Sequence, residues 1–135
     1  MRKKQLDFRH ICDIINHSVG GAMPLIQMKT TLPLDEESRA GLTAEFGRLM
    51  EIAGKPESFL MVGLEDRCDL RFAGKPMEKG ALIAMQQVGE LSRDVYEKLT
   101  AEICRFLESR LGIDPKAVYI TYQAVNDWGW NGTDF

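Results

Sequence analysis

The strongest constraint on the fold of this chain is one pattern that occurs twice. Each copy consists of an apolar strand, an amphipathic helix, a helix-ending glycine, a proline shortly after it and a second apolar strand. In the first copy, residues 24–32 (PLIQMKTTL) predict a buried strand, and residues 35–53 predict a helix. Gly54 ends this helix, Pro56 follows, and residues 58–64 (SFLMVGL) predict the next strand.

The second copy begins with a predicted strand over residues 80–88 (GALIAMQQV). Ser92 then caps a helix that Gly112 ends, Pro115 follows, and residues 117–123 (AVYITYQ) predict the last long strand. Both helices have one apolar face, because their large apolar residues recur at intervals of three and four. These residues are Leu42, Phe46, Leu49, Met50 and Ala53 in the first helix, and Val95, Leu99, Ile103, Phe106, Leu107 and Leu111 in the second.

A strand–helix–strand unit forms a right-handed crossover with its two strands parallel. Two such units predict an α/β (α+β) chain in which one four-stranded sheet carries both helices on one face. Residues 69–72 (DLRF) predict a further short edge strand, before a turn at Ala73–Gly74. The strands are nearly continuous apolar runs, so the sheet face without helices also carries apolar side chains. We expect a symmetric homo-oligomer, because another copy of the chain would bury that face.

Composition and charge narrow the function classes. The chain has 135 residues, which suits one compact domain, and a net charge of −3. Nucleic-acid surfaces usually carry a basic stripe, and membrane spans need an apolar run of about 18 residues; the sequence shows neither. Its three cysteines have no CxxC spacing, which predicts a reduced, cytoplasmic setting without a metal cluster.

Several short motifs occur in order between residue 23 and residue 135. They are Met23–Pro24 at the first strand, GKP at 54–56, FAG at 72–74, Val88–Gly89, DPKAVYITY at 114–122 and GWNGTDF at 129–135. In this order and spacing, the motifs resemble those of the macrophage migration inhibitory factor (MIF) family of the tautomerase superfamily. The resemblance implies a homotrimer with a MIF-like fold over residues 23–135. It also implies a cofactor-independent keto–enol tautomerase acting on phenylpyruvate-like α-keto acids and dopachrome-like compounds.

The same resemblance implies which residues form the site. Pro24 matches the family's catalytic N-terminal proline, and Lys55 matches its lysine after the first helix. Val88 matches an isoleucine that lines the pocket, and Tyr119 matches a tyrosine that the neighbouring subunit supplies. Thr121 replaces the family's pocket asparagine. The aromatic wall of the pocket is expected at Trp128, Trp130 and Phe135.

A free prolyl amine at Pro24 suits this reaction, because a general base works best when its pKa lies near the ambient pH. Burial and the positive charge of Lys55 would both lower the pKa of that amine. Lys55 could bind a substrate carboxylate, and Tyr119 could donate to the developing enolate. Without the resemblance, the three residues have plainer interpretations: a strand-starting proline, a cation near a helix C-terminus and a core tyrosine.

Residues 1–22 show no capping signal and no clear periodicity, and we expect them to be disordered or a misannotated leader. The glycine codons of residues 20–21 could form a purine-rich ribosome-binding site before Met23. We therefore hypothesise that translation starts at Met23 and that removal of Met23 exposes Pro24. The alternative is a MIF-like signalling or binding protein, or a trimeric scaffold with a vestigial site, and it gains weight if the extension is retained. Receptor binding has no direct support in the sequence.

Overall fold

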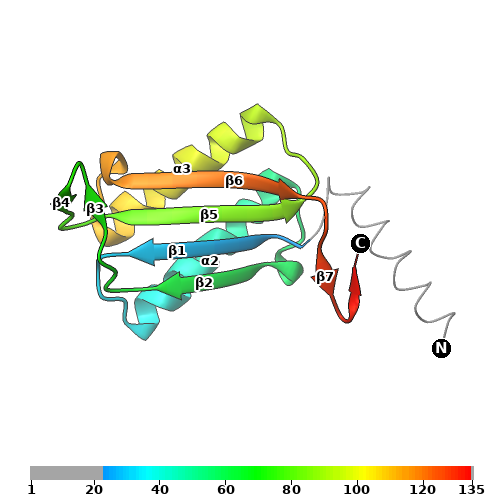
Figure 1. The fold of residues 1–135 in the computed structure, drawn as a ribbon, viewed down its shortest axis with the longest axis horizontal. Helices are drawn as coiled ribbons and strands as arrows, with labels where there is room; N and C mark the ends of the chain where they lie inside the picture. The colour runs from blue at the N-terminus through cyan, green and yellow to red at the C-terminus, as the bar shows by residue number, and fades with distance from the viewer. Residues whose placement is uncertain (1–22, 135) are drawn as a thin grey trace, which may run out of the picture.

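The computed structural model describes residues 23–134, which form a layer of sheet covered by a layer of helices (Figure 1). The main sheet has four strands in the order β2-β1-β5-β6. The elements of these two layers are β1 (Leu25–Thr30), α2 (Glu36–Ala53), β2 (Met61–Glu65), β5 (Ala81–Val88), α3 (Arg93–Leu111) and β6 (Val118–Val125). The predicted extension over residues 1–22 and the predicted pocket residue Phe135 lie outside the described residues.

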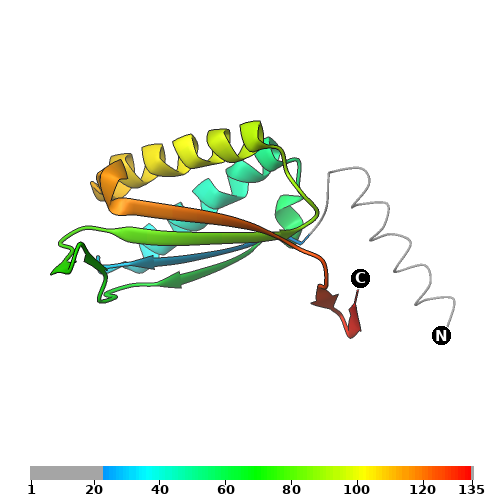
Figure 2. The same ribbon diagram turned by 45° about the horizontal axis from the view of Figure 1, so that its top comes forward.

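Two parallel strand pairs build the main sheet. β1 pairs with β2 and β5 pairs with β6 in parallel, while β1 and β5 meet antiparallel at the centre. A helix connects the strands of each parallel pair, α2 in the first and α3 in the second. Both helices lie on the same face of the sheet (Figure 2). The predicted α+β architecture of two βαβ units is therefore confirmed.

The helix ends follow the predicted local signals. Asp35 caps α2, because its Oδ1 accepts a hydrogen bond from the N–H of Ser38 at 2.8 Å. Ser92 caps α3 in the same way, accepting from the N–H three residues on at 3.3 Å. Gly54 and Gly112 end the two helices in the left-handed conformation, both with a φ of 67°. Glycine adopts this conformation without the steric cost that other residues meet.

The hydrophobic core lies between the helices and the covered face of the sheet. Ile26 and Met28 of β1 and Ile83 of β5 are buried in it. Above them, Phe46 of α2 meets Phe106 of α3 edge to face, with ring centroids 5.2 Å apart. Truncating a buried ring of this kind to alanine typically costs about 3–5 kcal/mol. This packing fixes the sheet that carries the candidate site residues.

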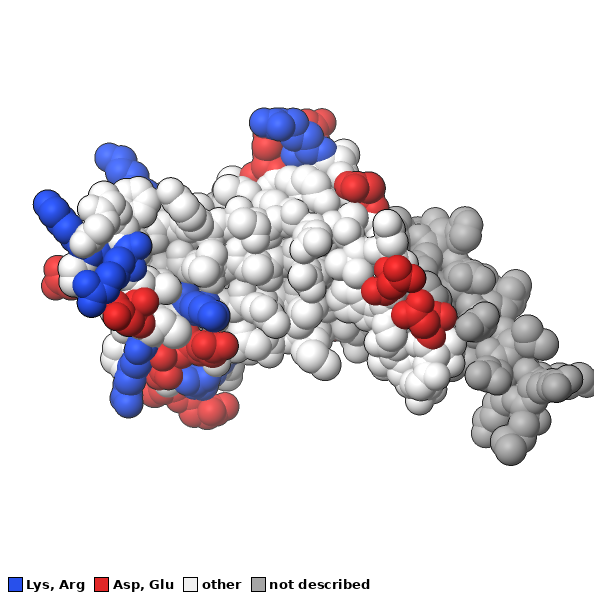
Figure 3. All heavy atoms as spheres, in the orientation of Figure 1, with Lys and Arg blue, Asp and Glu red and all other residues white. Residues whose placement is uncertain are grey.

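The open face of the sheet is more polar than predicted. Side chains alternate along each strand, so the apolar residues point mainly to the helices. On β6, the side chains of Tyr119, Thr121 and Gln123 are exposed on the open face, and on β1 those of Gln27 and Lys29 are. The centre of this face carries no charged side chain (Figure 3). The face thus mixes polar side chains with exposed apolar ones such as Met61 and Leu82, and its centre is uncharged. Depletion of charge is typical of protein interfaces.

Two short hairpins stand at opposite ends of the main sheet (Figure 1). One pairs β3 (Arg71–Phe72) with β4 (Lys75–Pro76), and the other pairs β7 (Gly129–Trp130) with β8 (Thr133–Asp134). The short strand predicted over residues 69–72 is therefore present at Arg71–Phe72, before the predicted turn, but it does not lie at the edge of the main sheet. The Ala73–Gly74 turn folds β3 onto β4 instead of leaving it free to pair with the main sheet.

The strand predicted over residues 58–64 begins three residues later than expected. A single 3₁₀ turn, η1 (Glu57–Phe59), precedes it and ends where the N–H of Leu60 donates to the carbonyl of Glu57 at 2.9 Å. A similar turn, η2 (Pro115–Ala117), precedes β6. Among residues 23–134, no helix is long and apolar enough to span a membrane.

Candidate active site

A cavity opens at the end of the main sheet where β1 begins. Its volume is about 490 Å³, and Pro24 forms part of its wall. Two of the three predicted aromatic wall residues, Trp128 and Trp130, line the same cavity. The other lining residues are Met23, Leu25, Ser58, Phe59, Leu60, Met61 and Gly129. Apolar and aromatic side chains dominate this wall, which suits the binding of a flat apolar group.

Pro24 is buried, and the neighbouring strand fixes its backbone. Its carbonyl accepts a hydrogen bond from the N–H of Met61 at 3.1 Å, where β1 and β2 begin to pair. In the full chain its nitrogen forms an amide with Met23, whose φ of 62° is left-handed. A non-glycine residue in this conformation is disfavoured by roughly 1–2 kcal/mol. A residue before proline is restricted further, so the Met23–Pro24 junction is strained.

A buried lysine approaches the same end of the sheet. Lys55 is only 5% exposed, and its Nζ donates a hydrogen bond to the carbonyl of Val88 at 3.1 Å. The turn at Gly54 fixes its backbone, because the N–H of Lys55 donates to the carbonyl of Met50 at 2.9 Å. Burial lowers the pKa of Lys55 from 10.5 to about 8, because the ammonium loses contact with water. Lys55 is therefore mainly protonated at neutral pH.

Antiparallel pairing places Val88 and Pro24 at one end of the sheet. β5 ends at Val88, while β1 begins at Leu25, which pairs with Gln86 of β5. The hydrogen bond to Val88 draws Lys55 to the same end. The predicted site residues that the fold gathers at this end are Pro24, Lys55, Val88, Trp128 and Trp130.

Tyr119 and Thr121 do not join this group within one chain. Leu25 stands opposite Gln86, whereas Tyr119 stands opposite Leu82, four positions earlier on β5. At about 3.3 Å per residue, this places Tyr119 roughly 13 Å along the strands from the level of Leu25. The alternative interpretation of Tyr119 as a core residue is also wrong, because its side chain is 63% exposed. Within one chain, the Tyr119 hydroxyl group and the candidate base Pro24 therefore lie far apart.

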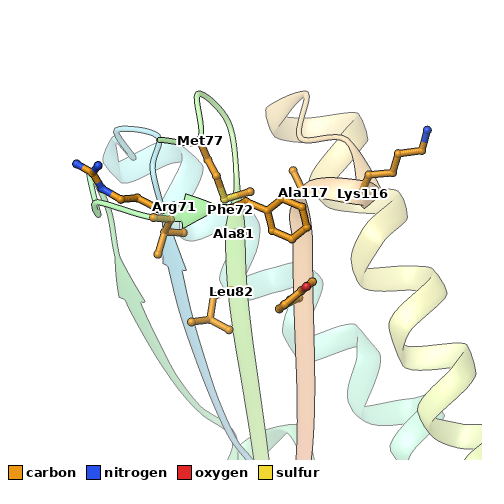
Figure 4. Close-up of a pocket in the computed structure, with 9 residues that line it drawn as sticks. Arg71, Phe72, Met77, Ala81, Leu82, Lys116 and Ala117 are labelled. Carbon is orange, nitrogen blue, oxygen red and sulfur yellow. The ribbon is translucent and has the colours of Figure 1, made fainter. Parts of the chain in front are cut away.

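A second, smaller pocket lies beside Tyr119 at the opposite end of the sheet (Figure 4). Its volume is about 130 Å³, and apolar side chains such as Met77 and Leu82 line it. The ring of Phe72 meets the ring of Tyr119 edge to face, with centroids 5.9 Å apart. The charged ends of Arg71 and Lys116 point away from the pocket (Figure 4). This pocket therefore offers an apolar surface and one exposed phenol.

Seven of the ten residues that line the larger cavity were not predicted as site residues, among them Phe59 and Met61. The ring of Phe59 meets that of Trp130 edge to face, with centroids 5.4 Å apart, and Met61 is 69% exposed. The sequence pattern predicts both residues inside a strand over residues 58–64, whereas the structure places Phe59 in η1 and Met61 at the start of β2. The turn-forming residues before Phe59 were the signal that the strand starts later.

The residues gathered near Pro24 offer three chemical properties. The cavity wall is apolar and aromatic, and Pro24 would be a secondary amine if it began the chain. Lys55 is a buried cation at the same end of the sheet, but neither Lys55 nor Val88 is among the residues that line the cavity. Among residues 23–134, no group of three or more His, Cys, Asp and Glu side chains is placed to hold a metal ion. The cavity therefore suits an apolar ring, and a free amine at Pro24 would be placed to transfer a proton there.

Comparison with known proteins identifies the family. The sequence profile of macrophage migration inhibitory factor (MIF) matches residues 23–135. MIF2 of Leishmania major superimposes with a TM-score of 0.79 at 31% identity, over 86% of this chain and 100% of its own. A MIF homologue from Prochlorococcus marinus superimposes with a TM-score of 0.75 at 27% identity, over 82% and 98%. MIF of Meriones unguiculatus is 28% identical over 117 residues, which cover 84% of this chain and 99% of that protein. The chain therefore belongs to the MIF family, within the tautomerase superfamily.

Proposed function

We propose that this protein is a cofactor-independent keto–enol tautomerase of phenylpyruvate-like α-keto acids, with Pro24 as its general base. The observation that supports this most is the position of Pro24 in the wall of an aromatic cavity, at the sheet end that also holds Lys55. Tautomerisation moves a proton from the carbon next to the ketone to the enol oxygen, and back. A secondary amine with a pKa near neutral can carry that proton.

Lys55 supplies the charge in this proposal. Its ammonium binds the carboxylate of the keto acid, and it lowers the pKa of the Pro24 amine, because two cations close together repel. Trp128 and Trp130 hold the phenyl ring of the substrate. Because the pKa of Lys55 is about 8, activity should rise as Pro24 loses its proton and fall as Lys55 loses its own.

We further propose that the working protein is a homotrimer in which each site combines two copies. Tyr119 lies too far from Pro24 within one chain to contact the same substrate, so a neighbouring copy would bring it there. The outer edges of β2 and β6 are free to pair in the described chain, and the nearly uncharged open face can pack against another copy. Thr121, two residues from Tyr119 on β6, would arrive with it.

The active form should begin at Pro24. A peptide bond to Met23 makes the Pro24 nitrogen an amide, which cannot act as a base near neutral pH. Residues 1–22 would then be a leader that the working protein lacks.

Three forms of the protein test this proposal: one beginning at Pro24, one with a single alanine before Pro24, and the full chain. The absorbance of the enol of phenylpyruvate reports the rate, and mass spectrometry confirms each N-terminus. The form beginning at Pro24 should be active. The alanine form should lose activity by about 10²–10⁴-fold, the usual contribution of a general base, although only one residue is added. Equal rates in the three forms would refute Pro24 as the base.

The same assay addresses the alternative of a MIF-like binding protein or a trimeric scaffold. If the form beginning at Pro24 is folded and trimeric but has no tautomerase activity, the site is vestigial and the alternative is favoured. Folding is measured by circular dichroism and the oligomeric state by sedimentation. A stable monomer at micromolar concentration would instead contradict the shared site.

A further inference from the structure

A completely buried glutamine lies one residue before Val88. Gln87 is 0% exposed and projects from β5 toward the helices, among apolar side chains. Its Nε2 donates two hydrogen bonds, one to the carbonyl of Gly89 at 3.3 Å and one to the hydroxyl of Tyr96 at 2.9 Å. Its Oε1 is buried without a hydrogen-bond partner among the described residues, so the two donated bonds alone define the position of the side chain.

Helix α3 holds the Tyr96 end of this arrangement in place. The ring of Tyr96 stacks on that of Tyr122 of β6, with centroids 4.5 Å apart and planes 29° apart. The hydroxyl of Tyr122 is in turn hydrogen-bonded to that of Thr100 on α3 at 2.8 Å. The stacked ring of Tyr122 leaves Tyr96 little freedom to move, so Tyr96 presents a fixed acceptor to Gln87.

The other hydrogen bond of Gln87 holds the backbone segment next to the carbonyl that Lys55 binds. Gly89 follows the last residue of β5 and has a φ of 86°, so the chain turns away from the sheet there. The bond from Gln87 to the Gly89 carbonyl closes a short loop around Val88. The carbonyl of Val88, inside that loop, accepts the hydrogen bond from the Lys55 ammonium. The hydrogen bond between Tyr96 of α3 and Gln87 of β5 is thus connected to Lys55 through the backbone of Val88 and Gly89.

We propose that Gln87, held by Tyr96, is a positioning residue that fixes the Val88 carbonyl and thereby the ammonium of Lys55. Its catalytic consequence rests on the proposed tautomerase function, because Lys55 binds the substrate carboxylate there. Its effect on Lys55 itself does not depend on that function. The competing explanation is structural: the cluster merely ties α3 to the sheet.

Three substitutions separate these explanations. Gln87→Met keeps the length of the side chain but removes both donated hydrogen bonds. Tyr96→Phe keeps the stacked ring but removes the acceptor of one of them. Tyr122→Phe is the matched control, because it removes a hydroxyl from the other ring of the same stack and leaves both bonds of Gln87 intact. Thermal unfolding of each variant reports its stability.

The first measurement is independent of activity. In full-length protein with ¹³C-labelled lysine, the NMR signal of the Lys55 side chain is followed through its titration. Gln87→Met should move the midpoint upward, toward the ordinary lysine value, because a released ammonium reaches water and escapes the burial that lowers its pKa. Tyr96→Phe should give a smaller shift in the same direction. Tyr122→Phe should give none.

The second measurement uses protein beginning at Pro24. Gln87→Met should raise KM for phenylpyruvate about fivefold, the factor expected for one hydrogen bond of ordinary strength, and should leave kcat nearly unchanged. If all three variants lose stability while the titration of Lys55 stays in place, the positioning role is refuted. If the wild-type protein is inactive but Gln87→Met shifts the titration, the proposed function fails and the positioning of Lys55 stands.

Discussion

The two ends of the main sheet carry similar hairpins but different cavities and different candidate site residues. Each end carries a hairpin with a two-residue turn, Ala73–Gly74 in one and Asn131–Gly132 in the other, and all four turn residues have positive φ. Each hairpin contributes an aromatic ring, Phe72 or Trp130, that meets a ring of the main body edge to face. Positive φ at both positions is typical of type I′ turns, which match the twist of paired strands.

The chemistry of the two ends is complementary. The Pro24 end has a cavity of about 490 Å³ and a buried lysine, whereas the Tyr119 end has an apolar pocket of about 130 Å³ and an exposed phenol. A candidate base and cation lie at one end, and a candidate hydrogen-bond donor lies at the other. The repeated βαβ pattern therefore does not give two equivalent sites. It gives two halves that could form one site between copies of the chain.

The largest expected effect is a loss of tautomerase activity in each of two variants, one altered at the Pro24 end of the sheet and the other at the Tyr119 end. Protein with one alanine before Pro24 lacks the base and should lose about 10²–10⁴-fold in rate. Tyr119→Phe lacks the phenol and should lose roughly 10²-fold. Mixed and refolded at equal amounts, the two should recover about a quarter of the normal activity, because random assembly pairs the intact ends at about that frequency.

Each damaged protein refolded alone is the control for this mixing experiment. Native mass spectrometry should show that mixed oligomers form. If mixed oligomers are present and activity does not recover, the two ends do not form a shared site.

A smaller effect should appear in the dependence of stability on pH. The pKa of Lys55 is about 8 in the folded protein and 10.5 in the unfolded chain, so the unfolded state binds more protons between these values. Burial of the ammonium therefore destabilises the fold below pH 8, and stability rises as pH increases from 8 to 10.5. The full contribution is at most about 3 kcal/mol. Lys55→Met should remove it.

Urea unfolding at pH 7.5, 9 and 10.5 measures this contribution as the difference between wild type and variant. Lys116→Met, at the Tyr119 end, is the control, because Lys116 is exposed and its removal should leave the pH dependence unchanged. A constant difference between wild type and Lys55→Met at all three pH values would contradict the burial of a charged Lys55.

The two edge-to-face contacts should each contribute a coupling energy of about 0.5–1.5 kcal/mol. Double-mutant cycles with leucine measure this, using Phe59 with Trp130 at one end and Phe72 with Tyr119 at the other. Similar couplings would show that the same contact holds both hairpins. A coupling near zero at one end would show that other contacts hold that hairpin.

The smallest effect concerns the two turns. Ala73 has a φ of 53°, which is unfavourable for alanine, whereas Asn131 has a φ of 52° and belongs to a residue type that tolerates it. Ala73→Gly should therefore stabilise the protein by about 0.5 kcal/mol, the strain relieved less the extra flexibility of glycine in the unfolded chain. Asn131→Gly should be nearly neutral. Thermal unfolding measures both, and equal effects would contradict the difference between the turns.

Local signals were sufficient for the helices and the strand order of each unit. Asp35 and Gly54 mark the ends of α2 by hydrogen bonds and dihedral angles that involve only nearby residues, so their sequence signature was reliable. The start of β2 was predicted too early, because Phe59 and Leu60 are apolar whether they form a strand or a turn. The nearly continuous apolar runs also made it hard to see from the sequence that side chains alternate between the two faces. In β6, for example, the exposed positions are tyrosine, threonine and glutamine.

The sequence by itself determined the four long strands, the two helices, their order and the two βαβ units. Only the tertiary structure decided which residues meet: Lys55 with Val88, Phe59 with Trp130, and Tyr119 with Phe72, at the far end from Pro24. The reason is that β1 lies between β2 and β5, antiparallel to β5, and this arrangement sets which strand ends share an edge. The way in which the two units join, and the register between β1 and β5, arise from packing between residues far apart in the chain, and a local pattern does not encode them.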